Sequence, residues 1–302
     1  MHNRSMRPPR PLPPTPRSGL TAAQATALGI TRARLRNADV AHPFQGINVP
    51  GRAPLTLEDR CRSLQLKMPA AARFCGLTAA ILVGVPLPAA LERSTAVHVA
   101  VPRGSRTLVG RGVRGHTFLR TPSDVRDWHG LRLSSPERIW CELAADLPLD
   151  HLVAAGDFLI HHRLPHTTVP LLNLAVENWP GRRGRPALER ALPLLNDRAE
   201  SAQESRLRVI LTMGGVSGLV ANFPITTQDG YRYRVDLALP HRRVFIEYQS
   251  DEFHIYSRRA DMTRISRLQA DDWVGVEVNA DDLDNPVELC ARIQRIVAQQ
   301  IQ

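Results

Sequence analysis

Two carboxylates stand in the segments of the sequence that otherwise look most like buried strands. Within "RVDLALPHRRVFIEYQ", residues 234–249, Asp236 and Glu247 each interrupt an apolar run. The basic turn "PHRR" between the runs predicts a hairpin, which would place the two acids side by side on neighbouring strands. Burying two ionised carboxylates together is costly unless a cation compensates their charge.

A divalent metal ion is one such cation. Mg²⁺ takes oxygen ligands and needs only one or two carboxylates besides water and substrate phosphate. Glu247 and Gln249 are two residues apart, so both are expected on one face of their strand, with Tyr248 on the packed face. The alternative is a solvated sheet face on which nearby arginines pair with two surface carboxylates. The acid pair alone leaves both alternatives open.

The last hundred residues predict the elements that would hold these acids. A helix is expected from a cap at Asn196 to Gly214-Gly215, followed by strands near 219–227, 231–239 and 243–249. A polar helix "SRRADMTRISRLQAD", a strand "WVGVEVNADDL" and an amphipathic helix "NPVELCARIQRIVAQQ" complete the chain. The expected order is therefore α-β-β-β-α-β-α.

This order and its acids resemble the PD-(D/E)XK nuclease superfamily. The similarity is strongest to the branch related to very-short-patch-repair endonucleases, which includes an uncharacterised bacterial domain family, and it covers about residues 196–290. It implies an α/β (α+β) restriction-endonuclease-like fold for residues 196–302 and a Mg²⁺- or Mn²⁺-dependent hydrolase that acts on duplex DNA.

The resemblance also implies roles for individual residues. Asp236, Glu247 and the Tyr248 carbonyl would hold the metal ion. Glu204, in "SAQESRLR", is expected to approach from the helix and to orient a water or a second ion.

Three further positions of the family pattern are Gln249, His254 and Arg264. Gln249 stands where the superfamily has a lysine that polarises the attacking water, and glutamine can only hydrogen-bond. His254 and Arg264 would contact phosphate or assist proton transfer, or would be structural. The change to glutamine favours an alternative class of function, a transcriptional regulator or antitoxin whose nuclease fold is catalytically silent.

Near the N-terminus, "LTAAQATALGITRARLRNADV" predicts a short helix, a turn at Gly29 and a second helix capped by Thr31, and "FQGINVP" predicts a strand after it. Arg32, Arg34 and Arg36 would make the second helix basic. This is the layout of a winged helix-turn-helix, and a small helical cap on the next domain is the alternative. The segment resembles AbiEi-type antitoxins of type IV toxin–antitoxin systems, which implies DNA binding through the three arginines and a possible cognate toxin.

The composition favours a polyanionic partner. The formal net charge is +10 and the isoelectric point is about 10.5, and phosphate contacts release counterions from nucleic acid. An arginine-rich proteome would give the same composition, because nearly every basic residue is arginine. Residues 1–19 are expected to be a disordered basic tail, followed by a winged helix over 20–52, a mixed α/β region over 53–195 and the nuclease-like domain.

Several features favour a cytoplasmic protein. No run of about 18 apolar residues predicts a membrane helix, and the basic N-terminus has no apolar core that would make it a secretory signal. The four cysteines form no CxxC pair, so free thiols in a reducing compartment are expected rather than disulfides or a zinc site.

Overall fold

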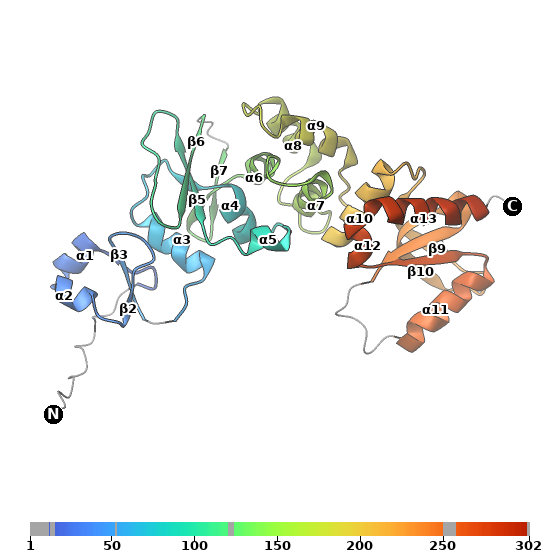
Figure 1. Ribbon diagram of the computed structural model, residues 1–302, viewed down its shortest axis with the longest axis horizontal. Helices are drawn as coiled ribbons and strands as arrows, with labels where there is room; N and C mark the ends of the chain where they lie inside the picture. Colours follow the sequence, from blue (N-terminus) through green and yellow to red (C-terminus); the bar gives the residue numbers. More distant parts are fainter. Residues whose placement is uncertain (1–11, 13–15, 52, 120–123, 250–257, 301–302) are drawn as a thin grey trace. The chain divides into compact units, whose positions relative to one another are not determined.

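The computed structural model describes residues 12, 16–51, 53–119, 124–249 and 258–300, and within them the protein is a mixed α/β chain with sheets of three, five and four strands. It divides into two compact units, residues 1–84 with 88–142 and residues 85–87 with 143–302 (Figure 1). The boundary near Glu142 falls inside the segment 53–195. The division of the chain at 19, 52 and 195 stays a prediction.

The first unit contains two small sheets with their helices. The first elements are β1 (Leu20–Thr21), α1 (Ala22–Ala27), α2 (Arg32–Leu35), β2 (Val40–Ala41) and β3 (Ile47–Pro50), with strand order β1-β3-β2. They are followed by α3 (Leu57–Gln65), β4 (Arg73–Phe74), α4 (Gly76–Val83), α5 (Ala89–Glu92), β5 (Val97–Pro102), β6 (Val113–Phe118), β7 (Val125–Trp128), β8 (Leu131–Ser134) and α6 (Pro136–Leu143). The five-stranded sheet has the order β6-β5-β4-β8-β7.

The second N-terminal helix is capped by Thr31, as the sequence predicts, but it is shorter than expected. The Thr31 hydroxyl accepts a hydrogen bond from the Arg34 backbone N–H at 3.2 Å. Helix α2 ends at Leu35, whereas the sequence indicated a helix through Val40. The Arg34 guanidinium instead reaches Asp39 in a two-pronged ion pair of 2.9 and 2.7 Å across the turn after the helix.

The second unit begins with helices and continues into the four-stranded sheet. Its helical part comprises α7 (Leu149–Ile160), α8 (Val169–Glu177), α9 (Arg185–Ala191) and the 3₁₀ turn η2 (Leu192–Leu194). The rest comprises α10 (Ala202–Met213), β9 (Val220–Thr226), β10 (Arg232–Leu239), η3 (Pro240–Arg242), β11 (Val244–Tyr248), α11 (Arg258–Ala270), β12 (Val274–Val278), α12 (Ala280–Asp284) and α13 (Pro286–Gln299). Apart from the short α12, this is the expected order of helices and strands.

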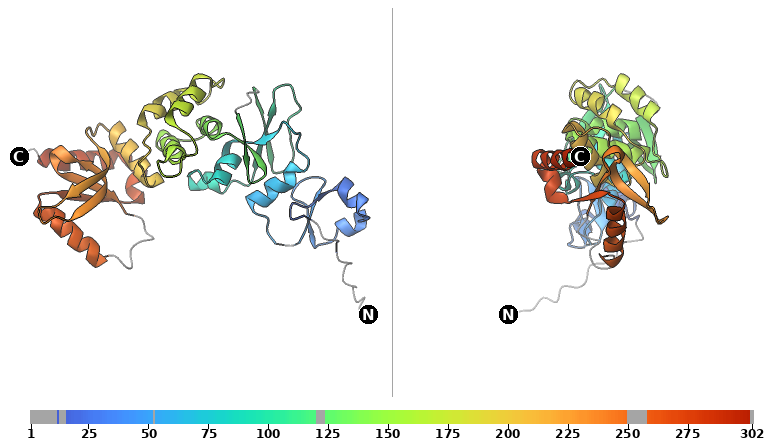
Figure 2. Two further views of the ribbon diagram at one scale, coloured as in Figure 1. Left: turned by 180° about the vertical axis from the view of Figure 1, so that it is seen from behind. Right: turned by 90° about the vertical axis from the view of Figure 1, so that its right-hand side faces the viewer.

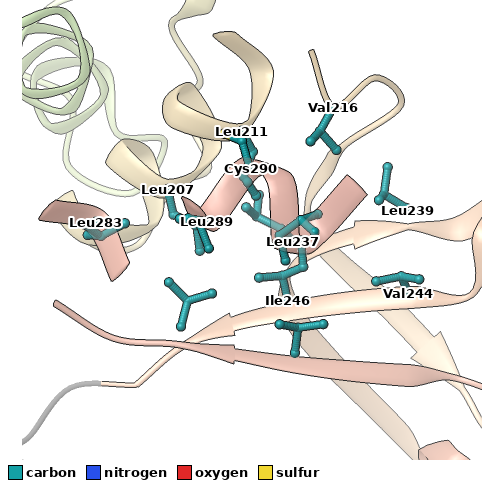
Figure 3. Close-up of a cluster of buried hydrophobic side chains, with 13 residues drawn as sticks. Leu207, Leu211, Val216, Leu237, Leu239, Val244, Ile246, Leu283, Leu289 and Cys290 are labelled. Atoms are coloured by element: carbon teal, nitrogen blue, oxygen red, sulfur yellow. The ribbon is translucent and has the colours of Figure 1, made fainter. Parts of the chain in front are cut away.

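The four-stranded sheet has the order β12-β11-β10-β9, with β11 parallel to β12 and the other pairs antiparallel. Helices α10 and α13 cover one face, where their leucines meet Leu237 and Ile246 of the strands (Figure 3). Helix α11 lies on the opposite face and packs Leu268 against Phe245 (Figures 1 and 2). Helices therefore cover both faces of the sheet.

Helix α10 starts later than the sequence indicated. Ser201 caps it by accepting a hydrogen bond from the Glu204 backbone N–H at 3.1 Å, and the expected cap Asn196 lies outside the helix. The Asn196 backbone N–H donates instead to the Asp157 carboxylate at 2.7 Å. The predicted end of the helix at Gly214 is correct.

In the described residues, no helix is both long enough and apolar enough to cross a membrane. All four cysteines are buried and free.

A buried charge joins α7 to α10. Asp157 is 1% exposed, and its carboxylate accepts hydrogen bonds from Arg208 Nη2 at 2.8 Å and from the Ser205 hydroxyl at 2.7 Å, besides the one from Asn196. Burial raises the pKa of Asp157, against the lowering effect of Arg208. The carboxylate thus gathers donors from α10 and from the loop before it, and fixes where the helix that carries Glu204 begins.

We expect Asp157→Ala to lower the free energy of unfolding by about 3–5 kcal/mol, because Arg208 is left as a largely buried charge without its partner. Denaturant unfolding of the full chain measures the change. The control is Glu189→Ala, which removes a carboxylate from the exposed pair with Arg185 and should cost no more than about 0.5 kcal/mol. Equal effects of the two variants would show that the buried network does not hold the helices together.

Candidate functional site

Asp236 and Glu247 lie at the same level of adjacent strands. The register pairs Leu237 of β10 with Ile246 of β11, and continuing it by one residue places Asp236 opposite Glu247. Phe245 packs on the α11 side of the sheet, so Glu247, two residues further on, points to that side as well. The two acids therefore meet at the end of the strands that faces α11.

Asp236 is tied to the backbone of the neighbouring strand. Its Oδ2 accepts a hydrogen bond from the Tyr248 backbone N–H at 2.9 Å, and the Tyr248 ring packs against the core on the α10 and α13 side, as expected. Burial raises the pKa of Asp236, and this outweighs the lowering effects of the Tyr248 N–H, Arg264 and Arg234. The carboxylate is thus fixed in place, and its charge is only partly compensated.

Glu204 approaches from the first turn of α10. Its Oε2 accepts a hydrogen bond from the Glu200 backbone N–H at 3.1 Å, so part of its role is to complete the start of the helix. Burial raises the pKa of Glu204, and the negative charge of Asp236 raises it further. The two carboxylates are therefore close enough to repel each other.

Arg264 of α11 supplies the positive charge of the site. Its guanidinium forms an ion pair with the carboxylate of Glu247, which is 8% exposed. Burial lowers the pKa of Arg264, and the charge of Asp236 raises it. An arginine thus pairs with one of the two acids, but Glu247 is buried, whereas the alternative to a metal ion expected two surface carboxylates on a solvated sheet face. The guanidinium is paired with Glu247 and also interacts electrostatically with Asp236.

The other positions of the family pattern are less informative. The Gln249 backbone N–H donates to the Val278 carbonyl at 2.8 Å, so the pairing of β11 with β12 continues to the position of the superfamily lysine. His254 lies outside the described residues. Within the described ranges, no three histidine, cysteine, aspartate or glutamate side chains are arranged so that they could hold a metal ion.

Some charged neighbours of the site were missed by the sequence reasoning. Glu200 forms ion pairs with Arg163, at 3.1 Å, and with Arg234 of β10. On β12, the exposed Glu277 is the register partner of Glu247. Glu277 had a signal like that of Asp236, an acid inside the apolar run "VGVEV", whereas the pairs of Glu200 depend on contacts between distant parts of the chain.

The arginines in α2 and at its C-terminal cap differ in accessibility. Arg32 and Arg36 are exposed, but Arg34 is engaged with Asp39 and only 14% of its side chain is accessible. Two of the three arginines expected to contact DNA are therefore open to solvent.

No family model matches the sequence. The uncharacterized proteins MT2308 and Rv2248, from two strains of Mycobacterium tuberculosis, are each 31% identical to this chain over 239 residues, which is 78% of this chain and 85% of each relative. Among solved structures, the crystal structure of the RV2827C protein from Mycobacterium tuberculosis aligns with a TM-score of 0.40 and 16% identity, over 63% of this chain and 75% of that one.

The raised pKa of Asp236 predicts how stability depends on pH. A group whose folded-state pKa is raised contributes stability below its unfolded pKa and loses it as pH rises through the folded value. Asp236→Asn keeps the shape of the side chain and an acceptor for the Tyr248 N–H but removes the charge. In EDTA, the unfolding free energy of the variant relative to the wild type should therefore increase between about pH 3 and pH 7.

Denaturant unfolding at a series of pH values measures this difference. Asp146→Asn, which removes an equal charge from a carboxylate that is 48% exposed, is the control. A difference between Asp236→Asn and wild type that stays constant over this range would mean that burial does not penalise the Asp236 charge.

Proposed function

Because the chain belongs to the same family as the uncharacterized mycobacterial proteins MT2308 and Rv2248, whose names state no reaction, we propose a function from the geometry of its own site. The proposed protein binds DNA, and its C-terminal domain, residues 196–302, is a metal-dependent phosphodiesterase of the endonuclease type. The observation that carries the proposal is the placement of Asp236 opposite Glu247 on adjacent strands, with the charge of Asp236 acting on Glu204 of helix α10.

The element order supports the proposed PD-(D/E)XK core. A helix with an acid in its first turn precedes three antiparallel strands, and a helix then leads to a strand parallel to the third. In this arrangement Asp236 and Glu247 occupy the acidic positions of the superfamily pattern, and Gln249 occupies that of the lysine.

The donor set fits a hard divalent cation. All three side chains offer carboxylate oxygens, which Mg²⁺ and Mn²⁺ prefer. Burial raises the pKa of both Glu204 and Asp236, and the negative charge of Asp236 raises the pKa of Glu204 further. Asp236, Glu247 and the Tyr248 carbonyl would hold the ion, with Glu204 beside it. When bound, the ion supplies Lewis-acid polarisation and charge stabilisation to the phosphate.

The chain's own groups have distinct proposed roles. The raised pKa of Glu204 brings its carboxylate closer to neutral pH, which suits a residue that accepts a proton from water. Gln249 orients water by hydrogen bonding, without the charge that a lysine would add. Arg264 lies next to the acids and offers the planar donor pair that binds phosphate oxygens, and His254 is the proposed proton donor to the leaving group.

A second candidate function is favoured by the ion pair between Arg264 and Glu247. An arginine that already neutralises one ligand reduces the attraction of the site for a cation, and Gln249 adds no catalytic charge. In this alternative the nuclease fold is silent. The protein is then an AbiEi-like antitoxin or transcriptional regulator, which binds DNA through the proposed winged helix of residues 20–52 and acts with a cognate toxin.

The test of the enzyme proposal is cleavage of plasmid DNA in Mg²⁺ and in Mn²⁺. Asp236→Asn and Glu247→Gln should each lower the rate by about a hundredfold or more, the size of effect seen when one electrostatic stabiliser is removed. Gln249→Lys should raise the rate, because it restores the charge that the superfamily has there. Asp146→Asn is the control, and its rate should equal that of the wild type.

Metal binding is measured independently of cleavage by thermal unfolding. A ligand that binds the native state at about 100 times its Kd stabilises the protein by about 2.7 kcal/mol, and this gain should vanish in the Asp236→Asn, Glu247→Gln double variant. If neither metal supports cleavage at any concentration and Gln249→Lys does not create it, the regulator replaces the enzyme.

A further inference from the structure

Positive charge is concentrated in the first of the two units. Residues 1–142 contain 21 arginine and lysine residues against 8 aspartates and glutamates, whereas residues 143–302 contain 18 against 21. The excess of positive charge over the whole chain thus belongs to the first unit, and the unit that carries the acidic site is net negative. Because counterion release drives binding to a polyanion, the first unit is the one suited to nucleic acid.

Several stretches of this unit carry arginines without any carboxylate, and residues 93–119 are one of them. Residues 93–119 contain five arginines and neither aspartate nor glutamate. All five are exposed, and we call the four that follow β5 the basic edge: Arg103, Arg106, Arg111 and Arg114. The ion pairs of the unit use other arginines, namely Arg34, Arg62, Arg73 and Arg138.

The fold lines these four residues along one border of the five-stranded sheet. Strand β6, which carries Arg114, is an edge strand and runs parallel to β5 (Figure 1). The loop 103–112 leaves the end of β5 and returns along β6 to its start, where Gly110 bridges Val113. The Leu108 carbonyl approaches Gly115 so closely that any Cβ there would collide with it. Gly115 therefore allows the loop to lie against the strand.

A cavity lies beside the start of β6. It has a volume of about 400 Å³, and its lining contains Lys67 and Arg111 but no carboxylate. Lys67, the only lysine in the sequence, donates to the Gln45 carbonyl at 2.8 Å. The Arg60 guanidinium lies over the Phe44 ring, 5.6 Å from its centroid, and reaches the neighbourhood of Gly112. Lys67 and Arg111 therefore line a hollow large enough for a phosphate group, and Arg60 lies next to Phe44 of its lining.

We propose that the basic edge, with this cavity at one end, binds the phosphate backbone of duplex DNA. The six residues of β6 span about 20 Å. At about 3.4 Å of helix axis per phosphate along one strand, that length matches on the order of six phosphates. Helix α2 offers fewer available arginines for phosphate, because Arg34 is paired with Asp39. This inference rests on the proposed DNA-binding function and specifies the surface that performs it.

The test is the salt dependence of binding of the full chain to a fluorescent duplex, measured by anisotropy in EDTA so that no cleavage contributes. Each lost phosphate contact lowers the slope of log K against log salt concentration by about 0.9. Replacing all four residues of the basic edge with alanine should therefore lower the slope by about 3.6. The control removes four exposed arginines of the second unit, Arg182, Arg183, Arg190 and Arg295, and should leave the slope near the wild-type value.

Circular dichroism checks that the variant is folded. If it is not, the double variant R111A/R114A should still lower the slope by about 1.8. An unchanged slope in a folded variant overturns the inference. So does a decrease of the slope in R32A/R36A that is larger than the decrease in the basic-edge variant. Tighter binding to single-stranded RNA than to the duplex also overturns it. If the wild type binds no duplex at all, the proposed DNA-binding function fails together with the inference.

Discussion

The carboxylate of Glu247 is the constraint on which the C-terminal domain depends. It is almost fully buried at the end of a strand, and a buried charge without a partner costs more than an average hydrogen bond returns. Arg264 meets this requirement, and in doing so it draws the face of α11 to the end of the sheet. The same principle applies between α7 and α10, where Arg208 forms an ion pair with the buried Asp157. This pair helps to position α10, the helix that carries Glu204.

The two units differ in charge: the positive charge that would attract DNA lies in the first, and the acids of the proposed chemistry lie in the second. The first unit carries the excess of arginine, whereas the second is net negative and concentrates carboxylates at the sheet end. Phosphate brought near Glu204 and Asp236 would be repelled unless a cation lies between them. In the proposed function, DNA binding by the basic first unit would supply binding energy that offsets this repulsion.

The order of the last seven predicted elements was predictable because each has a local signal, either an apolar run or an amphipathic pattern. The start of α10 was not, because Asn196 and Ser201 are both good caps and the choice depends on Asp157, far away in the sequence. Helix α2 is short for a similar reason, since the Arg34 side chain bonds Asp39 beyond the helix end. At the site, alternation and the hairpin placed Asp236 opposite Glu247. The ion pairs of Glu200 join residues far apart in the sequence, and no local sequence pattern predicts them.

Arg264 links the two proposed functions, because the same guanidinium serves a different partner in each. In a silent fold it stays on Glu247 and permanently replaces the cation that the acids require. In an enzyme, a bound divalent ion would compensate the charge of Glu247, and Arg264 would be available to phosphate oxygens, which its paired donors suit. In the silent fold, the Arg264–Glu247 pair therefore opposes metal binding. In the enzyme, breaking the pair is part of the change that lets substrate bind. In the superfamily that the C-terminal domain resembles, a lysine adds positive charge next to the acids. Gln249 adds none in this chain, so the positive charge next to Glu247 comes from Arg264.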